Sequence, residues 1–176
     1  RPIIVTAMCT AMRRGDCCLL KWADVNLQTN FIRVKTAKTG VTVEIPIFPL
    51  LRDELMKLER GDSPFVFPEQ AELYKVNPDG ITDRVRKVMA AAGFKDKADL
   101  KEGETSRGEI SVMRDGGVRR SSIRDFHSFR VTWVTLALTA GVPLELVQRV
   151  TGHQTTDIVL KHYFQPGRED FRAALQ

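Results

Sequence analysis

Six polar side chains, spread along the chain in or beside apolar segments, are of types that can act on a phosphate ester. Arginine and lysine stabilise negative charge on phosphate oxygens, histidine transfers protons, and a tyrosine hydroxyl can serve as a nucleophile. The candidates are Arg13, Lys38, His127, Arg130, His153 and Tyr163. Taken singly, each has an ordinary structural explanation, because most lone charged residues are simply solvated. Only the ordered set indicates chemistry.

Cleavage of a phosphodiester needs a nucleophile, stabilisation of the charge that develops on phosphorus oxygens, and a proton for the leaving oxygen. A phenol, with a pKa of about 10, attacks poorly unless its proton is removed or the phosphate is polarised. Arg13 and Arg130 can hold the non-bridging oxygens through planar, permanently charged guanidinium groups. One such donor contributes only about 3–4 kcal/mol, so a slow uncatalysed reaction needs several positive groups around one phosphate.

The order of these residues and the strings around them resemble the tyrosine recombinase (phage integrase) family. The resemblance extends from about residue 3 to residue 165. Tyr163 lies ten residues after His153, one more than is common in the family, so the intervening turn must absorb a residue. The strings that carry the resemblance are TAMRRGD around Arg13, AKTG around Lys38, HSFR from His127 to Arg130, and TGHQ around His153.

The resemblance implies a role for each residue of the set. Tyr163 would form a 3′-phosphotyrosyl bond and release a 5′ hydroxyl, and Lys38 would be the general acid for that leaving oxygen. His127 would accept or donate a proton, and His153 would donate a hydrogen bond to the phosphate. Asp16, three residues after Arg13, matches an acidic position of the family and is expected to orient an arginine. The covalent bond conserves the energy of the linkage, so neither metal, ATP nor another cofactor is expected.

The expected partner is double-stranded DNA. A net charge of +5 and a pI near 9.3 suit a polyanion but are weak evidence alone. Four arginines are candidates for contacts to the DNA backbone, and a solvated loop explains most of them equally well: Arg14, Arg119, Arg120 and Arg124. The resemblance implies a homotetramer on DNA for the full-length protein, whereas the isolated domain is expected to be monomeric.

The elements that must position these residues indicate an α+β fold, mainly α-helical with a small antiparallel sheet. The two β-branched runs 31–35 and 41–45 predict a hairpin that turns at Lys38-Thr39-Gly40. Helical periodicity and end signals predict the other elements. The expected helices are 2–10, Arg13 to Trp22, one opening at Pro49, 81–92 closed by Gly93, 128–140 closed by Gly141, one opening at Pro143 and running to about Val150, and one capped by Thr155 or Thr156.

The 176 residues fit one domain, which we expect to be the catalytic domain of a longer protein. The chain starts at Arg1 without a methionine, so an upstream core-binding domain is expected to be missing. Residues 95–117 read as an insertion or mobile loop, with a possible hairpin pairing 109–113 with 118–122. No signal peptide is visible, and no apolar run reaches the length of about 20 residues that a membrane span needs. Cys9, Cys17 and Cys18 are interpreted as buried reduced thiols. We therefore expect a cytoplasmic protein that is bacterial or phage-encoded.

Two alternatives remain open from the sequence. A non-catalytic regulator could use the turn at Gly141–Pro143 as a helix-turn-helix, but it gives no reason for the ordered set. A type IB topoisomerase would share the chemistry.

The C-terminal tail, residues 166–176, has apolar positions at helical spacing after a Pro166-Gly167 hinge. We expect it either to dock onto a neighbouring protomer or to pack on its own domain.

Overall fold

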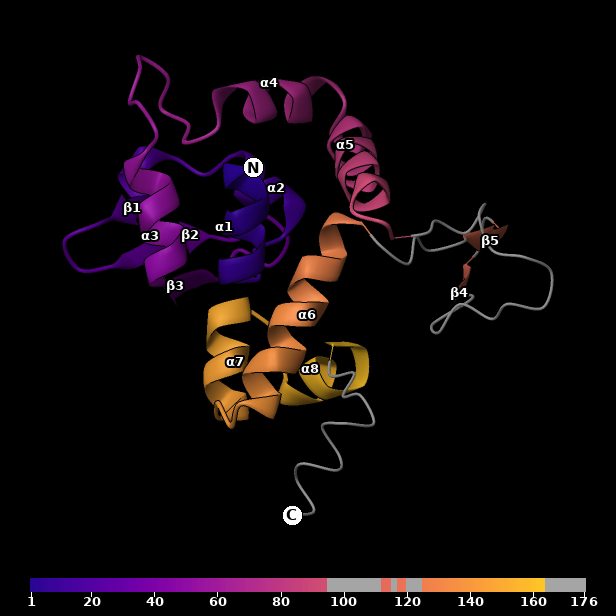
Figure 1. The fold of residues 1–176 in the computed structure, drawn as a ribbon. Helices are drawn as coiled ribbons and strands as arrows, with labels where there is room; N and C mark the ends of the chain where they lie inside the picture. The colour runs from indigo at the N-terminus through magenta and orange to yellow at the C-terminus, as the bar shows by residue number, and fades with distance from the viewer. Residues whose placement is uncertain (95–111, 115–116, 120–124, 164–176) are drawn as a thin grey trace.

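The computed structural model describes residues 1–94, 112–114, 117–119 and 125–163, with the backbone alone for the two short internal stretches and for 161–163. Most of the elements are helices, and the chain also contains a small antiparallel sheet. This composition confirms the predicted fold class (Figure 1). They are α1 (Pro2–Thr10), α2 (Arg14–Cys18), the 3-10 turn η1 (Trp22–Asp24), β1 (Val25–Asn26), β2 (Phe31–Lys35), β3 (Thr42–Pro46), α3 (Pro49–Met56), α4 (Pro68–Val76), α5 (Pro78–Ala91), β4 (Val112–Arg114), β5 (Gly117–Arg119), α6 (Phe126–Thr139), α7 (Leu144–Thr151) and α8 (Thr156–Tyr163).

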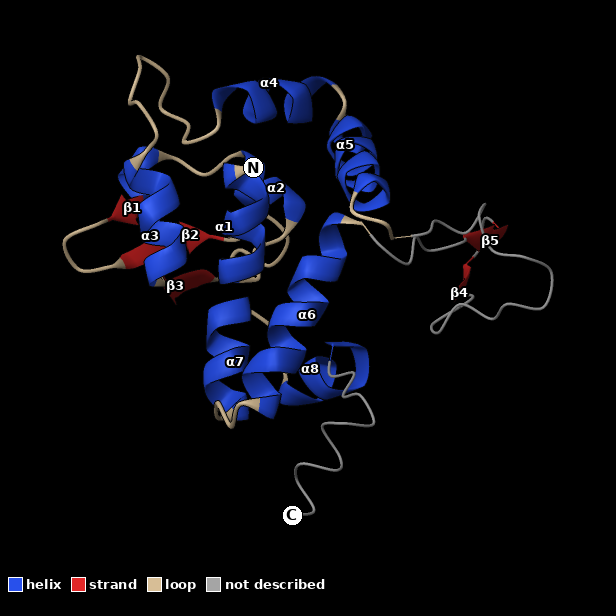
Figure 2. Cartoon of the chain, viewed as in Figure 1, coloured by secondary structure: helices blue, strands red, loops and turns tan. Residues whose placement is uncertain are grey.

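The sheet has the antiparallel order β1-β2-β3 (Figure 2). Ile32 pairs with Ile45 and both are buried, while the outward Arg33 pairs with Glu44 across the same two strands. This alternation is what a strand with one solvated face requires. The β2–β3 turn places Gly40 at a φ of +68°, in the left-handed region that favours glycine, and so confirms the predicted hairpin.

Two apolar clusters hold the molecule together. The larger one joins α1, α2, α3 and the sheet, and the smaller one joins α6, α7 and α8 through Val134, Val147 and Val159. Helix α6 packs against α1 and also against α7 and α8, so its two ends belong to different clusters (Figure 1). The three cysteines are buried free thiols, as expected, and lie in or beside the larger cluster. No helix in the described ranges is long and apolar enough to cross a membrane.

The helix predicted from Arg13 to Trp22 is shorter than expected. It ends at Cys18, because the chain then pairs with a distant segment: the Val66 amide donates to the Leu20 carbonyl at 2.8 Å, and the Trp22 amide to the Pro64 carbonyl at 3.0 Å. Those backbone groups cannot also continue a helix. A tertiary contact thus overrides local helix propensity.

Helix α4, which contains Tyr74, is not among the helices predicted from the sequence. Pro68 opens it and Pro78 opens α5, each at the first helical position that proline favours. Asn77 caps α5 by accepting a hydrogen bond from the Gly80 amide, so this helix starts earlier than the predicted residue 81.

In the C-terminal half of the chain two helix starts differ slightly from the prediction. Helix α6 starts at Phe126 rather than at residue 128, and Pro143 is the residue before α7 rather than its first residue.

The possible hairpin in the long polar stretch is present as β4 and β5, which pair Val112 with Arg119 and Arg114 with Gly117. The register is the predicted one, with Met113 opposite Val118, and one further pair forms nearer the turn. The expected insertion or mobile loop otherwise falls on residues 95–111 and 115–116, outside the described residues, as does the tail.

Candidate active site

Five of the six predicted residues come together from separate elements. Arg13 precedes α2, Lys38 lies in the β2–β3 turn, His127 and Arg130 lie in the first turns of α6, and His153 follows α7. Their proximity is evident in their electrostatics, because Arg130, Arg13 and Lys38 each lower the pKa of both histidines. Tyr163 is the last residue of α8, which packs on α6 and α7. The side chain of Tyr163 is outside the described part of the structure.

Arg130 is buried, with 2% of its surface exposed, and it joins the ends of two helices. Its Nη1 donates to the Ala11 carbonyl at 2.6 Å, and its Nη2 donates to the Thr151 carbonyl at 2.6 Å. Ala11 ends α1 in the left-handed region, with a φ of 54°, which costs about 1–2 kcal/mol for a residue other than glycine. The charged hydrogen bond to its carbonyl offsets that cost. Arg130 is therefore as much a structural residue as a candidate catalytic one.

His153 accepts a hydrogen bond at Nε2 in the structure instead of donating one from that atom. Arg130 Nη2 lies 2.9 Å from His153 Nε2, and a guanidinium can only donate, so Nε2 carries no proton. The proton is then on Nδ1, which donates to Thr151 Oγ1 at 2.7 Å, and the Thr151 hydroxyl donates to the Val147 carbonyl at 2.6 Å. Burial, and then the charges of Arg130 and Arg13, lower the pKa of His153 to about 3. The ring is neutral at pH 7.

The glycine of the Gly-His string has two reasons to be glycine. Gly152 ends α7 with a φ of 65°, which a side chain would strain. A Cβ there would also lie 3.1 Å from Cγ1 of Val43 on β3. The close approach brings His153 against the hairpin that carries Lys38. Gln148 fixes the loop from the other side, donating to the carbonyls of His153 and Gln154 at 3.2 and 3.0 Å.

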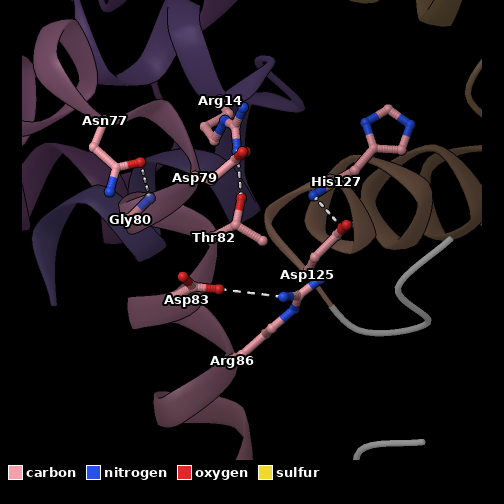
Figure 3. Close-up of polar contacts among 9 residues, drawn as sticks. All are labelled: Arg14, Asn77, Asp79, Gly80, Thr82, Asp83, Arg86, Asp125 and His127. Carbon is pink, nitrogen blue, oxygen red and sulfur yellow. Dashed lines mark hydrogen bonds and ion pairs between the residues drawn. The ribbon is translucent and has the colours of Figure 1, made fainter. Parts of the chain in front are cut away.

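His127 stands at the start of α6, where Asp125 caps the helix. The Asp125 carboxylate accepts from the His127 amide at 2.8 Å (Figure 3). Ser128 Oγ in turn accepts from the Asp125 amide at 3.0 Å. The ring is at the surface, yet partial burial among its neighbours and then the charge of Arg130 lower the pKa of His127, against the opposite effect of Asp125. A lowered pKa leaves His127 neutral at pH 7 and able to accept a proton.

Arg13 is half-buried, and its Nη1 is a buried donor with no hydrogen-bond partner among the described residues. A buried polar group without a partner is costly, and the neighbouring positive charges add repulsion. An anion bound among these groups would relieve both. The candidate site can therefore hold an anion, with Lys38 exposed at its edge.

Asp16 has a different partner from the arginine that the sequence suggested. Its buried carboxylate accepts from the Ala37 amide at 2.9 Å, which ties α2 to the residue before Lys38. A hydrogen bond between the hydroxyls of Thr36 and Thr39, at 2.6 Å, stiffens the same turn. Asp16 thus fixes Lys38 relative to Arg13 through the backbone. Side-chain partners of this kind have no signal in local sequence.

Arg14, predicted to contact DNA, has its guanidinium engaged within the protein (Figure 3). It donates to Asp79 at 3.2 Å and to Thr82, both on α5, and lies 5.8 Å from the ring centre of Tyr74 on α4. Gly15 permits this packing, because a Cβ there would lie 2.6 Å from the Tyr74 hydroxyl. Arg14 therefore holds α4 and α5 to α2, immediately beside Arg13.

We expect Arg14→Ala to lower the melting temperature by about 2–4 °C, as befits the loss of a partly exposed ion pair and its hydrogen bond. The dependence of log K for DNA on log salt should keep its slope. Arg84→Ala, on the exposed surface of α5, is the matched control and should change the melting temperature little. If the slope instead decreases by about 0.9 in Arg14→Ala, Arg14 contacts a phosphate and the intramolecular role is wrong.

The other predicted DNA contacts stay predictions. The backbone of Arg119 lies in β5, and its side chain is not described. Arg120 and Arg124 lie outside the described residues.

Comparison with known proteins places this arrangement in a family. A model of the phage integrase family matches residues 1–169. The integrase of Salmonella phage P22 is 21% identical over 166 residues, covering 92% of this chain and 38% of that protein. The chain therefore spans well under half the length of this curated relative.

Solved recombinase structures share the fold at low sequence identity. A XerA recombinase matches with a TM-score of 0.68 and 18% identity over 98% of this chain and 55% of its own. XerH bound to a palindromic difH substrate matches with a TM-score of 0.69 and 18% identity, over 99% of this chain and 44% of its own. A lambda integrase dimer bound to a core site matches with a TM-score of 0.65 and 18% identity, over 96% of this chain and 43% of its own.

Proposed function

The chain belongs to the phage integrase family, and on that premise we propose that it is the catalytic part of a site-specific DNA recombinase. It cleaves and rejoins double-stranded DNA through a covalent bond between Tyr163 and a 3′ phosphate, in the cytoplasm of a bacterial host. The observation that carries the proposal is the convergence of two arginines, a lysine and two histidines from four separate segments, with a buried Arg13 donor that lacks a partner in the described residues. A purely DNA-binding regulator has no use for buried groups of this kind.

In the proposed reaction Arg13 and Arg130 hold the non-bridging oxygens of the phosphate and stabilise the charge that develops there. The Tyr163 oxygen attacks phosphorus, and the bond to the 5′ oxygen breaks. His127, neutral at pH 7, accepts the tyrosine proton, and Lys38 donates a proton to the leaving oxygen. Rejoining reverses each step, so the bond energy of the cleaved strand is kept in the phosphotyrosine.

Cleavage should need no metal and no nucleotide. A pool of nicked duplexes with randomised sequence, incubated with the protein in EDTA and without ATP, should yield covalent protein–DNA adducts whose strands can be recovered and sequenced. A nick near the cleaved bond lets the short 5′-hydroxyl fragment diffuse away, which traps the adduct. The proposal would be wrong if cleavage required Mg²⁺ and released DNA ends without attached protein, as a two-metal nuclease does.

The proposed assembly is a homotetramer of the full-length protein on DNA. The proposed acceptor for a tail that docks onto a neighbouring protomer is an apolar groove of about 1420 Å³ between α1, β3, α5, α6 and α7. Its lining includes the exposed Met8, Val88, Leu136 and Leu146. An exposed apolar surface of this size is typical of an interaction site.

A chain that ends at Gln165 should lose assembly and cooperative strand exchange on DNA, while its monomer keeps its melting temperature. Sedimentation of the DNA complex and a thermal melt of the protein alone measure the two effects. Leu136→Glu, which places a charge in the groove, should reproduce the loss of assembly. A lower melting temperature of the truncated monomer would mean that the tail packs on its own domain.

A further inference from the structure

We propose that, at mildly acidic pH, His153 changes from hydrogen-bond acceptor to donor when an anion enters the site, by taking up one proton from solvent at Nε2. The inference rests on the proposed function, in which the anion is the phosphate of the DNA strand. In the structure Nε2 accepts from Arg130, whereas holding a phosphate oxygen requires an N–H at the same atom. One of two events must supply that hydrogen: a tautomer change or protonation.

A tautomer change disturbs more of the structure than protonation does. To move the proton from Nδ1 to Nε2, the ring would need a donor at Nδ1, where Thr151 Oγ1 is bonded at 2.7 Å. The Thr151 hydroxyl would have to turn away from the Val147 carbonyl, at 2.6 Å, and Arg130 would lose the Nε2 acceptor. Two buried hydrogen bonds would be lost. Protonation leaves the Thr151 bonds in place and displaces only the bond from Arg130.

The charges around His153 explain why the proton arrives only with the anion. The groups that face the ring are Arg130 and His127 from α6, Arg13 from the segment before α2, and Lys38 from the β2–β3 turn, and each of them lowers the pKa of His153. A negative charge at hydrogen-bond distance acts in the opposite direction and raises the pKa of a histidine by ~1–3 units. The ring should then gain its proton between about pH 4 and 6.

The anion takes over the hydrogen bond that the ring gives up. Arg130 Nη2 donates one hydrogen to the Thr151 carbonyl and the other to His153. When His153 is protonated, Arg130 and the ring both carry positive charge, and the second Nη2 hydrogen turns to an anion oxygen. That oxygen also accepts from the new Nε2–H. The same exchange keeps Arg130 attached to α7 through Thr151, so the helix ends need not move.

The test uses the chain labelled with ¹⁵N at histidine, with sulfate as the probe, because sulfate is tetrahedral and keeps its charge from pH 4.5 to 7.5. Long-range ¹H–¹⁵N spectra distinguish the two neutral tautomers and the imidazolium. Without sulfate, at constant ionic strength in chloride, His153 should be the neutral Nδ1–H form throughout the range. At saturating sulfate it should become imidazolium with a midpoint raised by about 1–3 pH units.

Binding should be linked to the same proton. Below the midpoint of the sulfate complex, the affinity for sulfate should rise by up to tenfold for each unit decrease of pH. His153→Gln, which keeps an oxygen acceptor for Arg130 but cannot take up a proton, should lose the part of this pH dependence that His153 contributes and keep only the weaker part that His127 contributes. Arg13→Ala should bind sulfate weakly at every pH, since it removes a permanent charge from the same site.

The possible results separate this inference from the proposed function. If sulfate shifts the resonances of His127 while His153 stays neutral at pH 5, the anion site exists and the proton uptake is wrong. An Nε2–H tautomer of His153 in the sulfate complex overturns it equally. If saturating sulfate changes neither histidine, and Arg13→Ala behaves as the unaltered chain, the inference fails and the adduct assay alone decides the function.

Discussion

Replacing Arg13 with alanine should lower the rate of DNA cleavage by about 10²–10³-fold and leave the fold intact. Its Nη1 has no partner in the described residues, so its removal breaks no hydrogen bond at that atom within the described part of the chain. Single-turnover cleavage of a nicked duplex measures the rate, and a thermal melt measures the fold. The loss should lie in the chemical step more than in DNA binding, because the guanidinium responds to charge that develops during the reaction.

Arg130→Ala should abolish cleavage to a similar degree and also destabilise the protein. Its removal strands the carbonyls of Ala11 and Thr151, which accept from it at 2.6 Å each, in the interior. At about 1–3 kcal/mol for each stranded group, the melting temperature should fall by roughly 10 °C. Arg33→Ala, on the exposed face of the sheet, is the matched control for arginine removal. Equal melting temperatures for the Arg13 and Arg130 variants would contradict the structural role of Arg130.

Tyr163→Phe should abolish covalent adduct formation altogether, because it removes the attacking oxygen and no other atom. Noncovalent binding of DNA should change by less than about twofold, since an aromatic ring of the same shape remains. Tyr74→Phe is the control, as Tyr74 is the other tyrosine of the chain. It packs against Gly15 and beneath Arg14, and its loss of a hydroxyl should leave adduct formation in place.

The positions that share a site could be predicted because local signals place each of them. The β-branched runs and Gly40 define the hairpin that carries Lys38, and Gly152 defines the end of α7 before His153. The three-residue spacing of His127 and Arg130 puts both on one face of α6. Resemblance to a family supplied the order of the set, and the structure then brought five of the six together.

The partners of these side chains could not be predicted. Arg130 and Ala11 are 119 residues apart in the sequence. Nothing near either residue indicates that the Arg130 guanidinium binds the Ala11 carbonyl at the end of α1. The same holds for Asp16, which binds the Ala37 amide, and for Arg14, which binds α5 instead of extending into solvent. Which group a side chain binds depends on tertiary packing. Sequence patterns therefore predicted the positions of these residues better than their hydrogen-bond partners.

The shortened α2 also results from tertiary packing. The residues from Leu19 to Trp22 have helical neighbours in sequence, yet their backbone groups pair with the segment from Pro64 to Val66. By contrast, the overlooked α4 had a readable signal, because Pro68 and Pro78 each stand at the start of a helix. In this segment, proline at a helix start is a stronger local signal than polar composition.

The central claim is that Tyr163 carries the DNA through a 3′ phosphate, and mapping the trapped adduct tests it most directly. After digestion with nuclease and trypsin, mass spectrometry should find a nucleotide attached to the peptide of residues 162–168, whose one tyrosine is Tyr163. The released strand should have a 5′ hydroxyl that a kinase can label without prior phosphatase treatment. A nucleotide on the peptide that contains Tyr74, or a tyrosine joined to a 5′ phosphate, would contradict the account.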